Sequence, residues 1–264
     1  NAISSGYTFS SISATHTVTA TYSANTLTIT YDSQGGSAIS SGSTTTGGSI
    51  ASSPGTPTRS GYTFNGWFVA SSGGSAITFP YTHNQTANFT LYAQWTANSY
   101  TITYKAGPNG TGSDLTQSFT YPGPATLKDA TANLTRTGYS ISGWTISNVS
   151  EAAQTNALSS SYSTAANLTL YPVWTINTYA ITVTQLSNGT ISPSTASYNY
   201  GSNQTFTFTP TTGYSVATIT IDGTALSGSA LTTAIASGYT FSSISATHTV
   251  TATYSINTYA ITVT

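Results

Sequence analysis

The sequence predicts a mainly β protein built as a tandem array of small modules stacked end to end. Three observations support this prediction: apolar and hydroxyl-bearing residues alternate over many short stretches, Gly-containing turns separate these stretches, and long segments of sequence recur. Alternation with a period of two is typical of a strand that buries one face. Recurrence at a fixed spacing is typical of repeat architectures, in which neighbouring units support one another.

The composition favours a folded chain whose polar surface is made of hydroxyls. Only 3% of the 264 residues are charged, against about a quarter in an ordinary soluble domain. Ser and Thr number 42 and 56, and 12% of the residues are aromatic. Disordered chains are poor in aromatic and β-branched residues, so this chain has the means to build a core.

The low charge also excludes some partners. Four cations spread over the whole length form no basic stripe for nucleic acid, and no apolar run approaches the ~18 residues that span a membrane. A net charge of −1 leaves little repulsion between copies. We therefore expect the chain to tolerate or favour lateral assembly.

The segment SGYTFSSISATHTVTATYS occurs at residues 5–23 and again at 237–255, an offset of 232 residues. Inside this period a junction motif centred on Asn recurs at Asn25, Asn98, Asn177 and Asn257. Taking each Asn as a boundary predicts a first module at 25–97, a middle module at 98–176 and a third module at 177–256. Residues 1–24 are then the C-terminal half of a module, and 257–264 are the first strand of another.

Because residue 1 falls inside a repeat, we expect the true N-terminus to lie elsewhere. We also expect both ends to be ordered, either as parts of a longer array or because the ends of adjacent copies complete each other.

The strands follow the same order in each module. Opening strands are predicted by the alternation at 26–31 and 100–104, and closing strands by the apolar positions of 89–95, 168–174 and 18–22. Turn dipeptides stand at 35–36, 109–110, 188–189 and 222–223, the last as a hairpin between two short strands. One short helix is predicted over Ala125–Leu134. The junctions contain neither Gly nor Pro, so we expect stiff connections that make the array a rod.

Two further motifs identify a family resemblance. The stretches Gly61–Trp67 and Gly138–Trp144 share a Gly-Tyr-x-x-x-Gly-Trp pattern, and each is followed by Leu-Tyr-x-x-Trp, at 91–95 and 170–174. This combination resembles the Listeria–Bacteroides repeat, the class that includes the B repeat of the internalins. The third module is similar to the related divergent bacterial surface repeat, through 189–193, Asp222-Gly223 and 239–241.

The resemblance implies small β-grasp-like or sandwich-like modules in secreted or wall-anchored bacterial proteins, where they serve as stalks, spacers and adhesion segments. It supplies no catalytic residues. The chain departs from the family in carrying Ser and Thr where Lys and Glu are common on the surface.

The ionisable residues do not form a recognisable catalytic set. Asp32 and Asp222 occupy turn sequences, in which a carboxylate caps local backbone N–H groups, whereas a glycosidase needs two acids that converge on a cleft. A cross-link from Lys105 or Lys128 to an Asn beside Glu151 is physically permitted. The nine charged residues are Asp32, Arg59, Lys105, Asp114, Lys128, Asp129, Arg136, Glu151 and Asp222.

Histidine and tryptophan are assigned structural roles. His16 and His248 occupy the same repeat position and His83 stands alone, so with no Cys a metal site or catalytic triad has little support. We assign Trp67, Trp95, Trp144 and Trp174 to core packing in preference to sugar stacking. Tyr92 and Tyr171, on the opposite strand face, are better candidates for contact with a partner. We predict no catalytic residue, no metal ligand and no cofactor.

The predicted function is mechanical: a repeat segment of an extracellular bacterial surface fibre, sheath or adhesin stalk that acts by rigid stacking and self-association. Its partners are other copies of itself or neighbouring repeats, and surface glycans or proteins remain open. The alternatives are a glycan- or protein-binding adhesin and the non-catalytic stalk of a larger secreted enzyme. Neither a nucleic acid partner nor a membrane span is expected.

Overall fold

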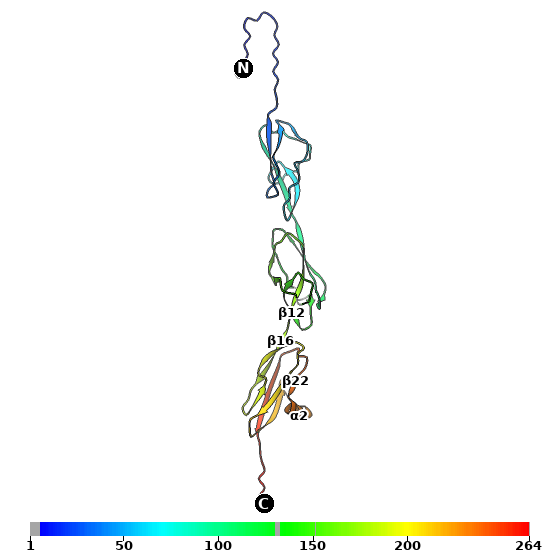
Figure 1. Cartoon of the computed structure of the whole chain (residues 1–264), viewed down its shortest axis with the longest axis vertical. Helices are drawn as coiled ribbons and strands as arrows, with labels where there is room; N and C mark the ends of the chain where they lie inside the picture. Colours follow the sequence, from blue (N-terminus) through cyan, green and yellow to red (C-terminus); the bar gives the residue numbers. More distant parts are fainter. Residues whose placement is uncertain (1–5, 130–132, 151, 264) are drawn as a thin grey trace. The chain divides into compact units, whose positions relative to one another are not determined.

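The computed structural model describes residues 6–129, 133–150 and 152–263, and the chain divides into two compact units, 1–98 and 99–264 (Figure 1). The first unit contains the first module, and the second contains the middle and third modules. A separate cluster of buried apolar side chains lies within each of these three modules. The prediction of a mainly β fold with small modules in tandem is confirmed.

The first module forms a four-stranded sheet in the order β2-β1-β6-β4 and a two-stranded sheet of β3 and β5. Ile29, Trp67, Leu91 and Ala93 are the most deeply buried members of its core. Its strands are β1 (Thr26–Asp32), β2 (Gly42–Thr45), β3 (Ser49–Ile50), β4 (Tyr62–Phe68), β5 (Tyr81–Thr82) and β6 (Phe89–Ala97).

The middle module forms a five-stranded sheet in the order β13-β12-β15-β7-β9, with two small sheets, β10-β14 and β11-β8. Trp144 and Tyr104 are its largest fully buried side chains. Its strands are β7 (Ser99–Tyr104), β8 (Thr111–Gly112), β9 (Leu115–Thr120), β10 (Ala125–Thr126), β11 (Leu134–Thr135), β12 (Tyr139–Thr145), β13 (Asn156–Ala157), β14 (Ser161–Tyr162) and β15 (Leu168–Ile176).

The third module forms a five-stranded sheet in the order β18-β16-β23-β20-β21 and a three-stranded sheet, β17-β19-β22. Phe206, Ile219 and Val250 lie at the centre of its core. Its elements are β16 (Thr178–Thr184), β17 (Gly189–Ser192), β18 (Ala196–Asn199), β19 (Gln204–Pro210), β20 (Tyr214–Ile221), β21 (Thr224–Ala225), α2 (Gly228–Ser237), β22 (Tyr239–Phe241) and β23 (His248–Ile256).

All three large sheets share one plan, in which the first and last strands of the module are parallel neighbours at the centre. These pairs are β1 with β6, β7 with β15 and β16 with β23. The predicted alternation is confirmed in β1, where Leu27, Ile29 and Tyr31 are buried and the residues between them are exposed. Such a strand places one row of side chains in the core and one row in solvent.

The predicted turns are also found. Gln34, Asn109, Asn188 and Asp222 all have positive φ, between 50° and 73°, a region that Asn and Asp tolerate better than most residues. Asp222 and Gly223 connect β20 to β21, which pair as the predicted hairpin.

The helix prediction is wrong. Residues 125–126 and 134–135 form β10 and β11, because each pairs with another short strand of the middle module. The remaining part of that prediction, at 130–132, lies outside the described residues. A helix occurs instead at Gly228–Ser237, where Ala234 is its buried residue. With so little burial, α2 leaves almost no apolar period in the sequence.

Neither terminal segment forms the strand that its sequence predicts. The described residues 6–25 and 257–263 contain no strand, although residues 5–23 are identical to 237–255, which contain β22 and most of β23. The cause is the lack of partners: β23 is held between β16 and β20. Residues 1–5 and 264 lie outside the described part.

Candidate functional site

The acidic residues do not converge on a common site in the described part of the chain. Asp32 caps its own turn, accepting the backbone N–H of Gln34 at 2.9 Å, as predicted. Lys105 and Asp114 form a half-exposed ion pair, with 3.1 Å between Nζ and Oδ2. Lys128 is exposed. Because neither lysine is buried, the structure does not favour the proposed cross-link, and Glu151, its predicted acid, lies outside the described residues.

The bonds of the Asp222 carboxylate are not the predicted caps of its own turn. Its carboxylate bonds to residues at the start of β23: Oδ1 accepts the Thr249 N–H at 2.7 Å, and Oδ2 lies 2.7 Å from Nδ1 of His248. Burial alone would raise the pKa of the Asp222 carboxyl, but the hydrogen bonds and charge of its partners hold that pKa below its usual value. The bonds from Asp222 to His248 and Thr249 hold the β20–β21 turn against the start of β23.

The other two histidines have no acidic partner of this kind in the described structure. His83 is buried, with Nε2 3.1 Å from the Thr44 hydroxyl, while Nδ1 accepts the Gln85 N–H at 3.2 Å. His16 is exposed and lies against Phe9. Among the described residues, no three His, Asp or Glu side chains are placed to share a metal ion.

The tryptophans divide into two kinds. Trp67 and Trp144 are fully buried, and their indole N–H groups donate to the carbonyls of Gly55 and Lys128, each at 3.0 Å. The predicted core role is correct for both. Trp95 and Trp174 lie near the C-terminal ends of β6 and β15 and are only half-buried.

These two half-buried tryptophans occupy equivalent positions but differ in their hydrogen bonding. Trp95 Nε1 donates to the Ser33 carbonyl at 2.9 Å. Trp174 Nε1 is shielded from solvent and has no acceptor among the described residues. The loop beside the indole explains the difference: four residues separate Tyr31 from Gly36, whereas five separate Tyr104 from Gly110. In the first module this loop supplies the Ser33 carbonyl. In the middle module the extra residue changes the path of the equivalent loop.

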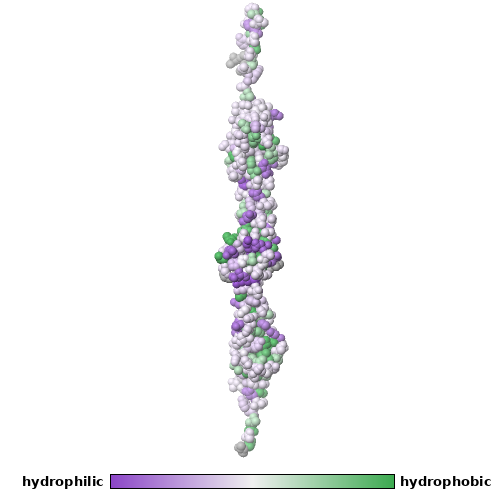
Figure 2. All heavy atoms as spheres, turned by 90° about the vertical axis from the view of Figure 1, so that its right-hand side faces the viewer, coloured by the Kyte–Doolittle hydropathy of each residue, from purple (hydrophilic) through white to green (hydrophobic). Residues whose placement is uncertain are grey.

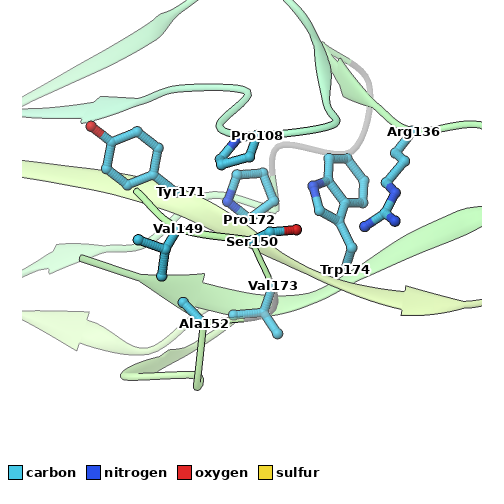
Figure 3. Close-up of a pocket in the computed structure, with 9 residues that line it drawn as sticks. All are labelled: Pro108, Arg136, Val149, Ser150, Ala152, Tyr171, Pro172, Val173 and Trp174. Carbon is cyan, nitrogen blue, oxygen red and sulfur yellow. The ribbon is translucent and has the colours of Figure 1, made fainter. Parts of the chain in front are cut away.

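Trp174 lies in the wall of a groove in the middle module, which we call the 171–174 groove (Figure 3). Its central hollow has a volume of about 100 Å³. One neighbouring hollow shares Arg136 and Trp174 with it, and another shares Pro108 and Tyr171. The central hollow is lined by Pro108, Arg136, Val149, Ser150, Ala152, Tyr171, Pro172, Val173 and Trp174.

The groove follows the part of β15 that has no strand on one side. The parallel partner β7 pairs with β15 only as far as Leu170, and the last bond on that side joins the Lys105 N–H to the Leu170 carbonyl at 2.9 Å. Beyond it the 105–110 loop passes over β15, with Gly107 beside Tyr171 and Gly110 beside Trp174. A Cβ at Gly110 would lie 3.0 Å from the indole, so the close approach requires glycine.

The exposed faces of the sheets carry hydroxyls in cross-strand pairs. Thr218 pairs with Thr253 at 2.6 Å between hydroxyl oxygens, and Thr205 pairs with Thr240 at 2.7 Å. Much of the surface in Figure 2 is pale because Ser, Thr and Tyr are neither strongly hydrophilic nor strongly hydrophobic. The edge strands β2, β9 and β18, one from each large sheet, contain no charged side chain.

The backbone N–H groups of three junction asparagines bond to residues that come just before another strand. The N–H groups of Asn98, Asn177 and Asn257 donate to the carbonyls of Gly61, Gly138 and Gly213 at 2.8–2.9 Å. Asn177 also accepts, through its backbone carbonyl, the N–H of Tyr200 in the third module at 2.9 Å. The junction motif therefore reflects a repeated hydrogen-bonding role.

Comparison with known proteins identifies each module. Residues 27–94 and 100–173 match the Listeria-Bacteroides repeat domain, and 179–258 match the Divergent InlB B-repeat domain. A protein of Evansella cellulosilytica named "Putative membrane protein" is 31% identical over 107 residues, which is 40% of this chain and 16% of that protein. The match thus spans less than a fifth of the relative's length. No described helix is long and apolar enough to cross a membrane.

Proposed function

The chain belongs to the Listeria-Bacteroides repeat domain family, and we propose that it is a structural segment of an extracellular or cell-surface bacterial protein. In this role it acts as a stiff spacer and associates with other copies or neighbouring repeats. Repeat modules of this kind are generally non-catalytic. Asp32 caps a turn, Asp114 takes part in a surface ion pair, and Asp222 bonds to His248 at the start of a strand, which supports a non-catalytic role.

The observation that carries the proposal is the absence of charge from the edges of the described sheets. A sheet edge presents unpaired backbone groups, and proteins that avoid edge-to-edge pairing commonly place Lys or Pro there. Here the edge strands β2, β9 and β18 consist of Ser, Thr, Asn and Gln together with Gly, Ala and three larger residues, Leu115, Phe119 and Tyr198. These edges can accept a strand or an edge from another copy without burying a charge.

Stiffness is supported by the junctions. In the second unit, Asn177 bonds to Gly138 on one side and to Tyr200 on the other. A junction held on both sides restricts bending more than a Gly- or Ser-rich linker does. We propose that this restriction allows successive modules to stack as a rigid series.

The test adds positive charge to the three edges. Ser43, Ser118 and Ser197 are exposed on β2, β9 and β18, and the triple variant S43K/S118K/S197K places a lysine on each. We expect sedimentation velocity to show concentration-dependent association of the original chain and its loss in this variant. The matched control S52K/S113K/S229K adds the same charge at exposed positions outside the strands. Equal association in all three chains, or none in the original chain, would contradict edge-mediated assembly.

A further inference from the structure

We propose that the first module binds an acidic sugar of a glycan, that is, a pyranose ring bearing a carboxylate, in a hollow beside Arg59 and Trp95. This site is independent of self-association, because the hollow contains no residue of the edge strand β2. Three observations support it: a guanidinium held in a fixed position, polar and aromatic walls around it, and differences from the other two modules.

The guanidinium of Arg59 packs against aromatic and backbone groups. Its central carbon lies 3.9 Å from the centre of the Tyr62 ring and 6.0 Å from the centre of a Trp95 ring. A Cβ at Gly35 would lie 3.6 Å from the same carbon, so the backbone of this turn is also in contact with the cation. The five N–H donors of a guanidinium lie in its plane. A guanidinium packed in this way therefore presents its donors at its edge.

These donors determine what the ligand must supply. Asp32 is the one acid of the first module, and its carboxylate accepts the Gln34 N–H instead of pairing with Arg59. No described acid lies within ion-pair distance of the Arg59 guanidinium, which belongs to a half-buried residue. A carboxylate matches two parallel N–H groups of a guanidinium edge and forms strong, charge-assisted hydrogen bonds with them. The ligand is therefore expected to bring a carboxylate into the hollow.

The other walls favour a sugar ring as the carrier of that carboxylate. The hollow has a volume of about 270 Å³. Trp95 forms part of its wall, with the indole held by the bond from Nε1 to the Ser33 carbonyl, and an aromatic face is a suitable surface for the C–H face of a sugar. Gln34, Ser71 and Ser72 also line the hollow and can bond to sugar hydroxyls. A peptide carboxylate would use the guanidinium and leave these groups without a role.

The loop that carries the two serines is held in place before any ligand arrives. Gln94 Nε2 donates to the carbonyls of Ala70 and Gly73 at 3.1 and 2.8 Å, one on either side of Ser71 and Ser72. A wall fixed by such bonds needs little ordering on binding, and this lowers the free energy that association costs.

The local turn does not require an arginine. The carbonyls of Arg59, Arg136 and Thr211 each accept the N–H of the tyrosine three residues later, at 3.1, 3.0 and 2.9 Å. The same turn therefore forms with Thr in the third module. Both arginines of the chain occupy this position, and what they add to the turn is a cation.

The middle module keeps the arginine but changes the walls. Arg136 lies over a tyrosine ring at 3.7 Å and stands at the edge of the 171–174 groove (Figure 3). The central hollow of that groove has a volume of about 100 Å³, and Val149 and Val173 stand where the first module has Ser72 and Gln94. A hydroxylated ring finds less room and fewer hydrogen-bonding partners there, so the middle module serves as an internal control.

The experiment titrates the ¹⁵N-labelled chain with cellotriouronate, a β-1,4-linked trimer of glucuronic acid, and follows the arginine Nε–H and indole N–H signals by NMR. The variants R59K and W95F identify the signals of Arg59 and Trp95 by their loss. We expect these two signals to shift on binding while those of Arg136 and Trp174 stay still.

Two further ligands separate the charge from the ring. Cellotriose has the same rings without carboxylates, and we expect it to bind at least about tenfold more weakly, because it lacks the charge-assisted bonds. Triglutamate has carboxylates without rings, and we expect it to bind more weakly than cellotriouronate as well. Equal binding of triglutamate would show that the hollow takes acidic peptides and would overturn the proposal.

Variants in the two modules complete the test. R59T introduces the residue of the third module, and we expect it to weaken cellotriouronate binding at least about tenfold. R59K keeps the charge but loses the paired donors, so it should restore only part of the affinity. The double variant S71A/S72A leaves Arg59 in place and should weaken binding about fivefold, whereas the matched variant R136T should change it less than about twofold.

Backbone spectra of each variant report whether the fold is kept, and the comparison of ligands on the unchanged chain needs no variant. No shift at Arg59, equal binding of cellotriose, or equal effects of R59T and R136T would overturn the proposal.

Discussion

The two copies of the 19-residue segment allow one prediction to be worked out in depth, because the same side chains are buried in one copy and exposed in the other. Val250 in β23 is 0% exposed, whereas the equivalent Val18 is 69% exposed. Truncating a buried Val removes about two methylene equivalents and leaves a cavity, at a cost of about 2 kcal/mol. We expect V250A to destabilise the third module by that amount, and V18A to change stability by less than about 0.5 kcal/mol.

Adding partner strands should make the two positions equivalent. Placing a copy of residues 177–236 directly before Ser5 supplies the counterparts of β16, β19 and β20, and thereby completes a module of the third type around Val18. In this fusion we expect V18A to cost about 2 kcal/mol as well. The assay is urea unfolding combined with hydrogen exchange measured by mass spectrometry, since the substitution also distinguishes the two otherwise identical peptides. Equal costs of V18A and V250A in the original chain would refute the reasoning, as would exposed amides around Val18 in the fusion.

Three further predictions test contacts at single residues. W95F removes a hydrogen bond that is made and should cost about 1 kcal/mol, while W174F removes none to a described residue and should cost close to zero, as measured by chemical unfolding of each variant. The pKa of the Asp222 carboxyl is lowered in the folded chain. The contribution of this carboxylate to stability is therefore present above the unfolded pKa of about 3.9, and it is lost as the pH falls through the lower folded pKa. Thermal unfolding between about pH 5 and pH 2 should show this loss of stability, and the loss should be smaller in D222N. Gly138 and Gly213 both have positive φ, but only a Cβ at Gly138 would meet a side chain, the ring of Tyr200. We therefore expect G138A to destabilise the second unit by at least about 1 kcal/mol more than G213A, and equal melting temperatures would contradict the contact between Gly138 and Tyr200.

The parts of the fold that the sequence predicts are those that local chemistry determines. The alternation around Ile29 predicts a half-buried strand because the side-chain period of a strand is two. The Asp222-Gly223 pair predicts a hairpin because few other residues adopt positive φ there. Helix α2 was not predicted, since Ala234 is its one buried residue and so small a buried surface leaves little pattern.

The candidate site depends on features that no local pattern contains. Trp95 and Trp174 stand in nearly the same sequence context, and both were assigned to the core. Their difference arises from one extra residue in a loop more than sixty positions earlier in the chain. The bond between Asp222 and the start of β23 joins residues 27 apart, and the turn sequence at Asp222 indicates only local capping. Longer-range contacts of this kind become visible only when the sheets are assembled.

The repeated sequences also show that the strand pairing is shared by all modules, whereas the loops differ between them. Residues 16–23 and 248–255 are identical, yet only the second copy forms a strand, so pairing partners rather than intrinsic propensity decide strand formation. Once the partners are present, the central strand pairs are the same in every module. The first and middle modules differ instead in the loop beside the closing Trp and in the residue before it, Gln94 or Val173. Changes at those places leave the sheets intact because they lie beyond the last paired residue of the opening strand. A repeat array can therefore keep one structural plan while the loops of individual modules differ, and among the described residues the middle module is the one in which the indole donor of the closing strand has no partner.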